Sequence, residues 1–309
     1  MKEHTLILLY HQFDEGKNIQ NRPDRKLIVS QNEFCWQLDY LSHNYSFIGI
    51  SDFVRQKEQG QKAGKNQVII TIDDGHYDNY IYAFPVLKRY SVPAIIYLCT
   101  GWINGIEKPW RLDVVSLLQS QTELKFEWKK KEYIFKLNSV KEVQYAYSQL
   151  SCLIVHEYDE QRETLLNVLN ECGLKKRSNG KLFLSWSDIL KMYQAGIEFG
   201  AHTITHPLLA QITENQMKKE IFRSVVEIEK KIGFKVEHFA YPYGGENAAQ
   251  NREFNFCKTI GLKSAVTTQR GICLDDCYQT KLLSLPRLSV NGIWNISEFI
   301  EQVRTIANE

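Results

Sequence analysis

Short apolar runs rich in β-branched residues alternate along this chain with helical patterns, and this alternation constrains the fold more than any other feature. Strands that are apolar throughout are buried on both faces, which is typical of parallel sheets built from β-α units. The predicted strands are Leu6–Tyr10, Val68–Ile72, Ala94–Leu98, Ile197–Ala201, His238–Tyr241, Ser264–Thr267 and Leu282–Leu285. They indicate an α/β barrel in a single domain that spans residues 1–309.

One helix has a clear start and end. Thr213 and Gln216 form a capping box, apolar residues recur at helical spacing from Met217 to Ile232, and Gly233 follows the last of them. This apolar stripe predicts packing against the core and no function.

The segment between the third and fourth predicted strands differs in kind. Residues 123–137 alternate apolar and polar side chains on either side of a lysine turn, which predicts a β-hairpin. A helical stretch from Val143 to Leu169 follows it. Together they predict an insertion at about residues 103–184, a length that loops of barrel enzymes tolerate.

Charge and hydropathy exclude several classes of function. With 38 basic against 36 acidic residues the formal net charge is +2, so no strong field attracts the whole molecule to nucleic acid or anionic lipid. The apolar stretch near the N-terminus has only about six residues, which is shorter than a signal peptide or a membrane span. We therefore expect a cytoplasmic protein without a transmembrane segment. The oligomeric state is not indicated.

The chain contains seven cysteines, an odd number without a C-x-x-C pair. This pattern favours free thiols in a reducing compartment. Cys273 and Cys277 could ligate a metal, but free thiols are the favoured interpretation.

Two adjacent acids follow the second predicted strand, in the stretch ITIDDGHYDN. Parallel α/β folds place ligands at the carboxyl ends of strands, and Gly75 allows a tight turn there. Neighbouring carboxylates repel each other unless a cation or a proton lies between them, so Asp73 and Asp74 indicate a metal. The alternative is that one of them caps the next helix and the other is solvated.

His202 and His206 follow the fourth predicted strand, in the stretch HTITHP. The residues between them disfavour a helix and Pro207 favours an extended His206, so we expect a loop that wraps a ligand. Two imidazoles and one carboxylate form a three-ligand metal site with a position left for water. One aspartate would then bind the metal while its neighbour accepts the proton of the water. A structural role for the histidines is the alternative.

Three further strand ends carry candidate residues. Pro242 and Tyr243 follow the fifth strand, where they either hold a backbone N–H toward an oxyanion or form an ordinary turn. His11 follows the first strand and is either a catalytic acid or a packing residue. Arg287, at the last strand, is either functional or part of a surface ion pair.

Taken together, these residues resemble the polysaccharide deacetylase family, also called the NodB homology or family 4 carbohydrate esterase group. TIDDG at 71–75 is similar to the family's T-F-D-D-G motif, HTITHP at 202–207 to its H-S/T-x-x-H-P motif, and AYPYG at 240–244 to its third motif. The resemblance covers most of the chain. It implies a distorted (β/α)7-type barrel, in agreement with the strands predicted above.

The resemblance implies a role for each motif residue. Asp73 would be the general base, Asp74, His202 and His206 would hold the metal, and Tyr243 would supply an oxyanion-hole N–H. The implied metal is zinc, with nickel or cobalt as alternatives.

The sequence also departs from the family pattern. The third motif usually begins with an arginine that positions the base, and Ala240 occupies that place. The late L-x-H motif, whose histidine is the general acid, is missing after residue 207. A subgroup that resembles the poly-N-acetylglucosamine deacetylases has an N-terminal Y-H motif that supplies the acid, and Tyr10 and His11 match it. Arg287 is then a candidate for the role of the missing arginine.

The expected function is hydrolysis of the N-acetyl group of an amino sugar in a polysaccharide or its precursor, so the expected partner is an N-acetylated carbohydrate. Two alternatives stay open. The chain could remove an acyl or formyl group from a small or lipid-linked sugar or from another amide. It could also be a non-catalytic carbohydrate-binding protein of the same fold, which the lost arginine and late histidine favour.

Overall fold

The computed structural model describes residues 4–16, 19, 21–61, 66–106, 109–157, 160–173, 180–274 and 279–307. The chain forms two compact units. The first contains Met1–Gly16, Leu27–Ile106 and Leu182–Glu309, and the second contains Lys17–Lys26 and Glu107–Lys181. The second unit therefore includes most of the segment expected as an insertion and adds a short segment near the N-terminus. Cys277, considered above as a metal ligand, lies outside the described residues.

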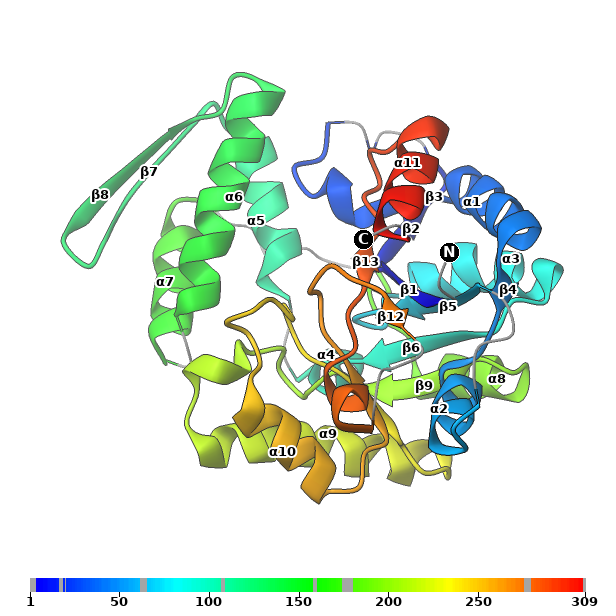
Figure 1. Cartoon of the computed structure of the whole chain (residues 1–309). Coiled ribbons are helices and arrows are strands. Elements are labelled where there is room, and N and C mark those ends of the chain that lie inside the picture. The colour runs from blue at the N-terminus through cyan, green and yellow to red at the C-terminus, as the bar shows by residue number, and fades with distance from the viewer. Residues whose placement is uncertain are drawn as a thin grey trace. The chain divides into compact units, whose positions relative to one another are not determined.

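The first unit is built around one curled sheet (Figure 1). Its strands follow the order β11 (Ser264–Val266), β10 (His238–Ala240), β9 (Glu198–Ala201), β6 (Ala94–Leu98), β5 (Gln67–Ile72), β1 (His4–Tyr10) and β12 (Cys273–Leu274). In addition, β4 (Ser46–Phe47) pairs with β5, and β13 (Leu288–Ser289) pairs with β1. The neighbours from β11 to β1 are parallel, whereas β12 is antiparallel to β1.

One segment of chain links the two edges of this sheet. Leu285 forms an isolated bridge with Val266 of β11, and β13, three residues further along, pairs with Leu8 and Leu9 of β1. The sheet therefore curls toward closure, and the predicted α/β class with a barrel-like sheet is confirmed.

The predicted strands occur within two residues of their expected bounds, except the last. The prediction of a strand at Leu282–Leu285 is wrong, because its first three residues belong to a 3₁₀ helix, η4 (Gln279–Ser284). A short apolar run fits a buried helical turn as well as a strand, and the core needs its leucines in either case. Strand pairing begins only at Leu285, which precedes a proline and is therefore extended.

The other elements of the first unit surround this sheet or lie at its ends. Its helices are α1 (Gln31–Asn44), α2 (Ile50–Glu58), α3 (Phe84–Tyr90), α4 (Thr100–Ile103), α8 (Trp186–Gln194), α9 (Glu214–Ile232), α10 (Asn251–Thr259) and α11 (Ile296–Ile306). The shorter elements are β2 (Gln12–Asp14), β3 (Ile28–Ser30), the π-helical turn η2 (Asn79–Ala83) and the 3₁₀ turn η3 (Leu209–Gln211). A further 3₁₀ turn, η1 (Arg25–Leu27), spans the boundary between the units.

The helix predicted after position 212 is confirmed as α9. The Thr213 hydroxyl accepts a hydrogen bond from the Gln216 N–H, and the Gln216 side chain in turn accepts one from the Thr213 backbone. Gly233 ends the helix in the left-handed conformation, with φ 78°. The predicted apolar stripe is buried, so this helix packs on the core as expected.

The interior of the sheet is filled by side chains of several strands. Ile7, Ile69 and Ile95 belong to one buried cluster with Phe53 of α2 and Leu285. Every residue of β1, β5 and β6 is buried. Both faces of these strands are therefore covered, as is typical of parallel sheets, and this explains their continuous apolar runs.

The second unit is formed by α5 (Trp110–Gln119), β7 (Glu123–Trp128), β8 (Lys131–Lys136), α6 (Val140–His156) and α7 (Glu160–Glu171). The predicted hairpin is confirmed, with Lys129 and Lys130 at φ 49° and 63° in its two-residue turn. The predicted helical stretch is two helices, because Glu157 is extended between them. None of the helices in the described ranges has both the length and the apolar character needed to cross a membrane.

Candidate metal centre and active site

The two adjacent acids at the carboxyl end of β5 contact different side chains. The Asp73 N–H donates to the carbonyl of Tyr10, which joins the ends of β5 and β1. Asp74 and Gly75 then both have positive φ, at 79° and 77°, and turn the chain sharply. A Cβ on Gly75 would lie 2.9 Å from a methyl group of Leu98, so only glycine fits this turn without rearrangement.

Asp73 forms a buried ion pair with Arg287, which is 0% exposed. The two guanidinium nitrogens lie 2.8 and 2.7 Å from the two carboxylate oxygens, a bidentate pairing. Arg287 also donates to the carbonyl of Thr267 and to the hydroxyl of Thr71. Burial by itself raises the pKa of Asp73, but the charge and hydrogen bonds of Arg287 hold that pKa below its usual value. Asp73 is therefore an ionised carboxylate.

The segment from His202 to His206 is a loop, as predicted, and not a helix. The extended conformation expected for His206 is wrong: Thr203 and His206 have positive φ, at 69° and 55°. The tertiary contacts of the loop override the preference set by Pro207, and the Thr203 hydroxyl accepts a hydrogen bond from the His206 N–H. The buried carboxylate of Glu220, on α9, accepts hydrogen bonds from the N–H groups of Ile204 and Thr205. These contacts hold the loop in a shape that brings both imidazoles to the same side.

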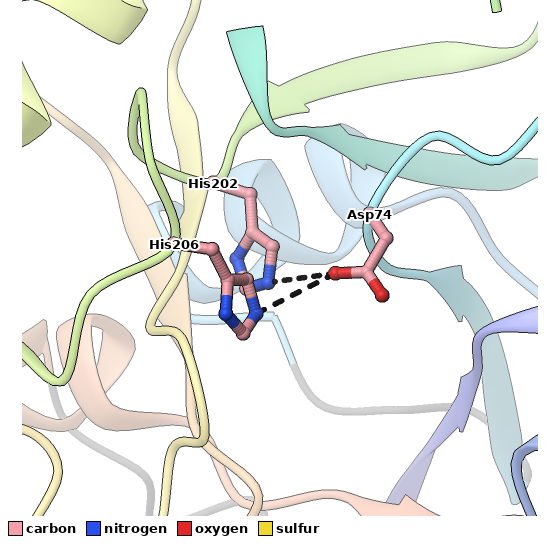
Figure 2. A group of neighbouring side chains, drawn as sticks. All are labelled: Asp74, His202 and His206. Atoms are coloured by element: carbon pink, nitrogen blue, oxygen red, sulfur yellow. Dashed lines mark ion pairs between the residues drawn. The ribbon is translucent and has the colours of Figure 1, made fainter. Parts of the chain in front are cut away.

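Asp74, His202 and His206 converge at one point (Figure 2). The Nε2 atoms of both histidines lie 3.5 Å from Oδ1 of Asp74, and the three side chains are buried. That oxygen is buried and has no hydrogen-bond partner. Tetrahedral metal sites with bonds of about 2.0–2.1 Å place ligand atoms roughly 3.4 Å apart, so the three residues fit a shared cation.

The electrostatics of the cluster also favour a cation. Burial alone would raise the pKa of Asp74, yet the imidazoles of His202, His76 and His206 around the carboxylate hold that pKa well below its usual value. Burial lowers the pKa of His202, but the neighbouring carboxylates of Asp74 and Asp73 raise it above normal, so the site attracts positive charge. Nδ1 of His202 lies 2.7 Å from the carbonyl of Ala240 and donates to it, which aims Nε2 at Asp74.

The other candidates lie beside these groups. His11 directly follows β1, and its charge contributes to lowering the pKa of Asp73. The buried side chain of Asn79 donates to the His11 carbonyl at 2.9 Å. Tyr243 has φ 63° at the centre of a γ-turn that is closed by a hydrogen bond from the Gly244 N–H to the carbonyl of Pro242.

The ring of Tyr243 also contacts His206, one of the three residues of the candidate metal site. It lies edge-on to the imidazole of His206, with 4.7 Å between the ring centroids. The structure therefore brings all seven candidate residues to the carboxyl ends of the strands. Arg287 does so from a segment that is not the strand expected for it.

Sequence reasoning missed three residues of this site. His76 lies two positions after Asp74 at the same strand end, so its place in the sequence is a signal that could have been used. Trp102, which stacks on His206, and Glu220 lie on helices, at positions that belong to no catalytic or metal-binding motif. No local pattern predicts either contact.

A curled α/β sheet that presents an Asp-His-His cluster and a second, ion-paired aspartate at its strand ends has the arrangement of a metal-dependent hydrolase. A sequence model of the polysaccharide deacetylase family matches residues 60–258, which is more than half of the chain. The chain belongs to the polysaccharide deacetylase family.

Among curated proteins, a poly-beta-1,6-N-acetyl-D-glucosamine N-deacetylase of Staphylococcus aureus is 35% identical over 105 residues, which is 34% of this chain and 34% of that protein. The enzyme of that name from Staphylococcus epidermidis is 40% identical over 78 residues, or 25% of this chain and 27% of that protein. The matched segments thus span about a third or less of the length of these relatives.

Solved structures agree on the fold over nearly the whole chain. Streptococcus pyogenes deacetylase PplD is similar with a TM-score of 0.65 and 19% identity, covering 98% of this chain and 99% of that one. IcaB from Ammonifex degensii is similar with a TM-score of 0.61 and 17% identity, covering 99% and 98%. At these identities the likeness concerns the fold alone.

Proposed function

We propose that this protein is a metal-dependent deacetylase that hydrolyses the N-acetyl group of N-acetylglucosamine units in a β-1,6-linked polysaccharide or its precursor. The observation that carries this proposal is the buried Asp74, His202 and His206 cluster beside the ion-paired Asp73. Membership of the family supports the reaction, and the activity for which the staphylococcal relatives are named supports the substrate class.

Asp74, His202 and His206 would hold the metal. A set of two imidazoles and one carboxylate suits zinc, with nickel or cobalt as alternatives. Bound there, the metal would polarise the amide carbonyl and lower the pKa of a water.

Asp73 would be the general base. Arg287 keeps it ionised and fixes its orientation, and a carboxylate that accepts one hydrogen bond on each oxygen still has lone pairs for a water proton. This assignment gives Arg287 the role of the arginine that Ala240 replaces. It explains why the guanidinium is fully buried and bidentate.

Tyr243 and His11 would complete the reaction. The ring of Tyr243 lies against the imidazole of His206, and the backbone N–H of Tyr243, in the γ-turn, would stabilise the oxyanion of the tetrahedral intermediate. His11, at the end of β1 and within electrostatic reach of Asp73, would protonate the departing amine.

The test is deacetylation by purified protein of three substrates: β-1,6-linked N-acetylglucosamine oligomers, the N-acetylglucosamine monomer and a lipid-linked N-acetylhexosamine. Metal content is measured in parallel, and activity is assayed after chelation and after zinc, nickel or cobalt is restored. We expect near-stoichiometric metal and an oligomer activity that is abolished by the chelator and restored by metal.

The open alternatives predict different results. A preference for the monomer or the lipid-linked sugar would favour the small-substrate deacylase. Metal-free protein that binds the oligomers without hydrolysing them would favour the non-catalytic binding protein. The cytoplasmic location stays a proposal that rests on the sequence, and cell fractionation with an antibody to this chain tests it.

A further inference from the structure

The second carboxylate oxygen of Asp74 is also engaged, by a residue outside the proposed ligand set. Nε2 of His76 lies 3.3 Å from Oδ2 of Asp74, whereas both ligand histidines face Oδ1. His76 is buried, with 7% of its surface exposed. The two oxygens of this carboxylate therefore have separate partners.

The contacts of His76 determine which of its nitrogens carries the proton. The side-chain nitrogen of Gln12 lies 3.4 Å from Nδ1 of His76, and an amide nitrogen only donates, so Nδ1 is the acceptor. The neutral ring then carries its proton on Nε2, the nitrogen that faces Asp74. Gln12 thus selects the tautomer that donates to Asp74, as an outer partner does for a metal-binding histidine.

Packing fixes the plane of the His76 ring. The ring stacks on Phe183, with centroids 5.0 Å apart and planes at 28°. The backbones of the two residues form an isolated bridge, which hydrogen bonds from Tyr77 N–H to Leu182 and from Leu184 N–H to Gly75 extend. The imidazole therefore has little freedom to rotate away from the carboxylate.

The same aromatic packing continues to a proposed metal ligand. Phe183 packs on Trp102 at 5.3 Å between centroids, and Trp102 stacks on His206 at 5.0 Å. A chain of ring contacts thus runs from His76 to His206. Both ends of this chain are in contact with Asp74.

We propose that His76 is a positioning residue that holds Asp74 by Oδ2, so that the carboxylate offers Oδ1 alone to the metal. The proposal rests on the metal centre proposed above. A carboxylate whose second oxygen is held by a histidine binds the metal through one oxygen only. This leaves room at the metal for water and substrate. Loss of an outer hydrogen bond of this kind typically weakens metal affinity or activity about 10–100-fold.

Two substitutions separate the hydrogen bond from the packing. His76→Phe keeps a flat ring against Phe183 and removes the donor. His76→Gln places an amide N–H near the position of Nε2 and removes the ring. Gln12→Leu removes the donor to Nδ1 and leaves His76 in place, and His43→Phe, on the exposed face of α1, is the matched control.

The measurement is the zinc dissociation constant of metal-stripped protein, by competition with a chelator of known affinity. Circular dichroism of each metal-free variant shows whether it is folded. We expect H76F to weaken zinc binding about 10–100-fold, H76Q to recover most of that loss and Q12L to fall between. H43F should bind zinc as the unmodified protein does.

The result distinguishes this inference from the proposed function. If the unmodified protein binds no zinc and does not deacetylate, the proposed function fails. If it does both and a folded H76F binds zinc within about twofold of it, the positioning role is wrong. Zinc binding by H76Q as weak as by H76F would also overturn the role, because the packing and not the donor would then set the affinity. Should H76F fail to fold, normal zinc affinity of Q12L together with weak affinity of H76Q would overturn the role in its place.

Discussion

At the scale of single residues, the site depends on two neighbouring aspartates that point to different partners. Asp74 has φ 79°, a conformation that costs a non-glycine residue about 1–3 kcal/mol and persists only when its surroundings hold it. His76, His202 and His206 supply that hold on one side. Asp73 pairs with Arg287 on the other side, which agrees with the proposed roles of one carboxylate for the cation and one for the proton.

The first prediction concerns Asp73. The Asp73→Asn variant should bind metal as the unmodified protein does but lose about 10²–10⁴-fold in deacetylation rate, because an amide cannot accept the proton of the water. Asp52→Asn, on an exposed part of α2, is the control and should keep full activity. Full turnover by metal-loaded D73N would show that Asp73 is not the base.

At the scale of elements, α9 supports the loop 202–206, which carries His202 and His206, through one side chain. The carboxylate of Glu220 accepts hydrogen bonds from two N–H groups of the loop and from the Thr205 hydroxyl, all at 2.9 Å. Burial raises the pKa of Glu220, although the hydrogen bonds of Thr205 and Ile204 oppose that rise. Glu220 thus fixes a loop without regular secondary structure to the helix.

The second prediction follows from this contact. Glu220→Ala leaves buried donors without an acceptor and should lower the free energy of unfolding by about 1–3 kcal/mol. It should also weaken zinc binding, because the loop then holds its histidines less firmly. Urea denaturation and the zinc dissociation constant measure the two effects. Glu214→Ala, at the exposed start of α9, should leave zinc affinity unchanged, and equal losses in both variants would contradict the role of Glu220.

A second polar cluster lies at the amino ends of β9 and β10, whereas the proposed metal ligands lie at the carboxyl ends of the strands. The hydroxyl of Ser51 donates to Glu198 and lies 2.9 Å from Nε2 of His238. Nδ1 of His238 lies 2.9 Å from the hydroxyl of Ser264. Burial lowers the pKa of His238 from 6.5 to about 4, a shift that the charge of Glu237 opposes and does not cancel.

The third prediction is a pH dependence of stability. Because the folded pKa of His238 is depressed, its contribution is fully present above pH 6.5 and is lost as the pH falls toward about 4. With one pKa unit worth about 1.4 kcal/mol, the loss amounts to roughly 3 kcal/mol. Glu198, whose pKa burial raises, acts in the opposite direction at acid pH.

A variant separates the titration of His238 from that of the other titratable residues. His238→Gln cannot be protonated and keeps a donor toward Ser51, so its free energy of unfolding should fall less between pH 6.5 and 4 than that of the unmodified protein. Urea denaturation at a series of pH values measures this difference. Parallel curves for the two proteins would mean that His238 does not titrate in this range.

At the scale of the whole molecule, the proposed metal ligands all belong to the first of the two compact units. A ligand that binds only the folded form stabilises it by about 2.7 kcal/mol at a concentration of 100 times its dissociation constant. That stabilisation acts on the unit whose folding assembles the site. The second unit has its own core, formed by the hairpin and α5 to α7.

The fourth prediction is that metal protects the two units unequally. Hydrogen exchange with and without zinc should slow in β5, β9 and the loop 202–206, and should not change in α5 to α7. The same zinc concentration added to His202→Ala should protect neither unit. Equal slowing throughout the chain would show that the two units respond to metal as one.

Local patterns were enough to predict much of this protein. The apolar runs, the capping box at Thr213 and the lysine turn at Lys129 depend on residues close in the chain. All the predicted strands but the last, together with α9 and the hairpin, formed where these patterns placed them. The acids and histidines could be placed at one edge of the sheet because the carboxyl ends of parallel strands lie together. The leucines of η4 were predicted as a strand because an apolar run alone does not distinguish a buried strand from a buried helical turn.

Contacts between distant segments depend on packing and could not be predicted in this way. Arg287 is 214 residues from Asp73, and only the curling of the sheet brings the segment between β11 and β13 to the end of β5. The stack of His76 on Phe183 likewise joins two segments that are separated in the sequence by most of the second unit, Glu107–Lys181. A single segment contains its own periodicity, but which remote side chain completes its hydrogen bonds is decided by how the elements pack.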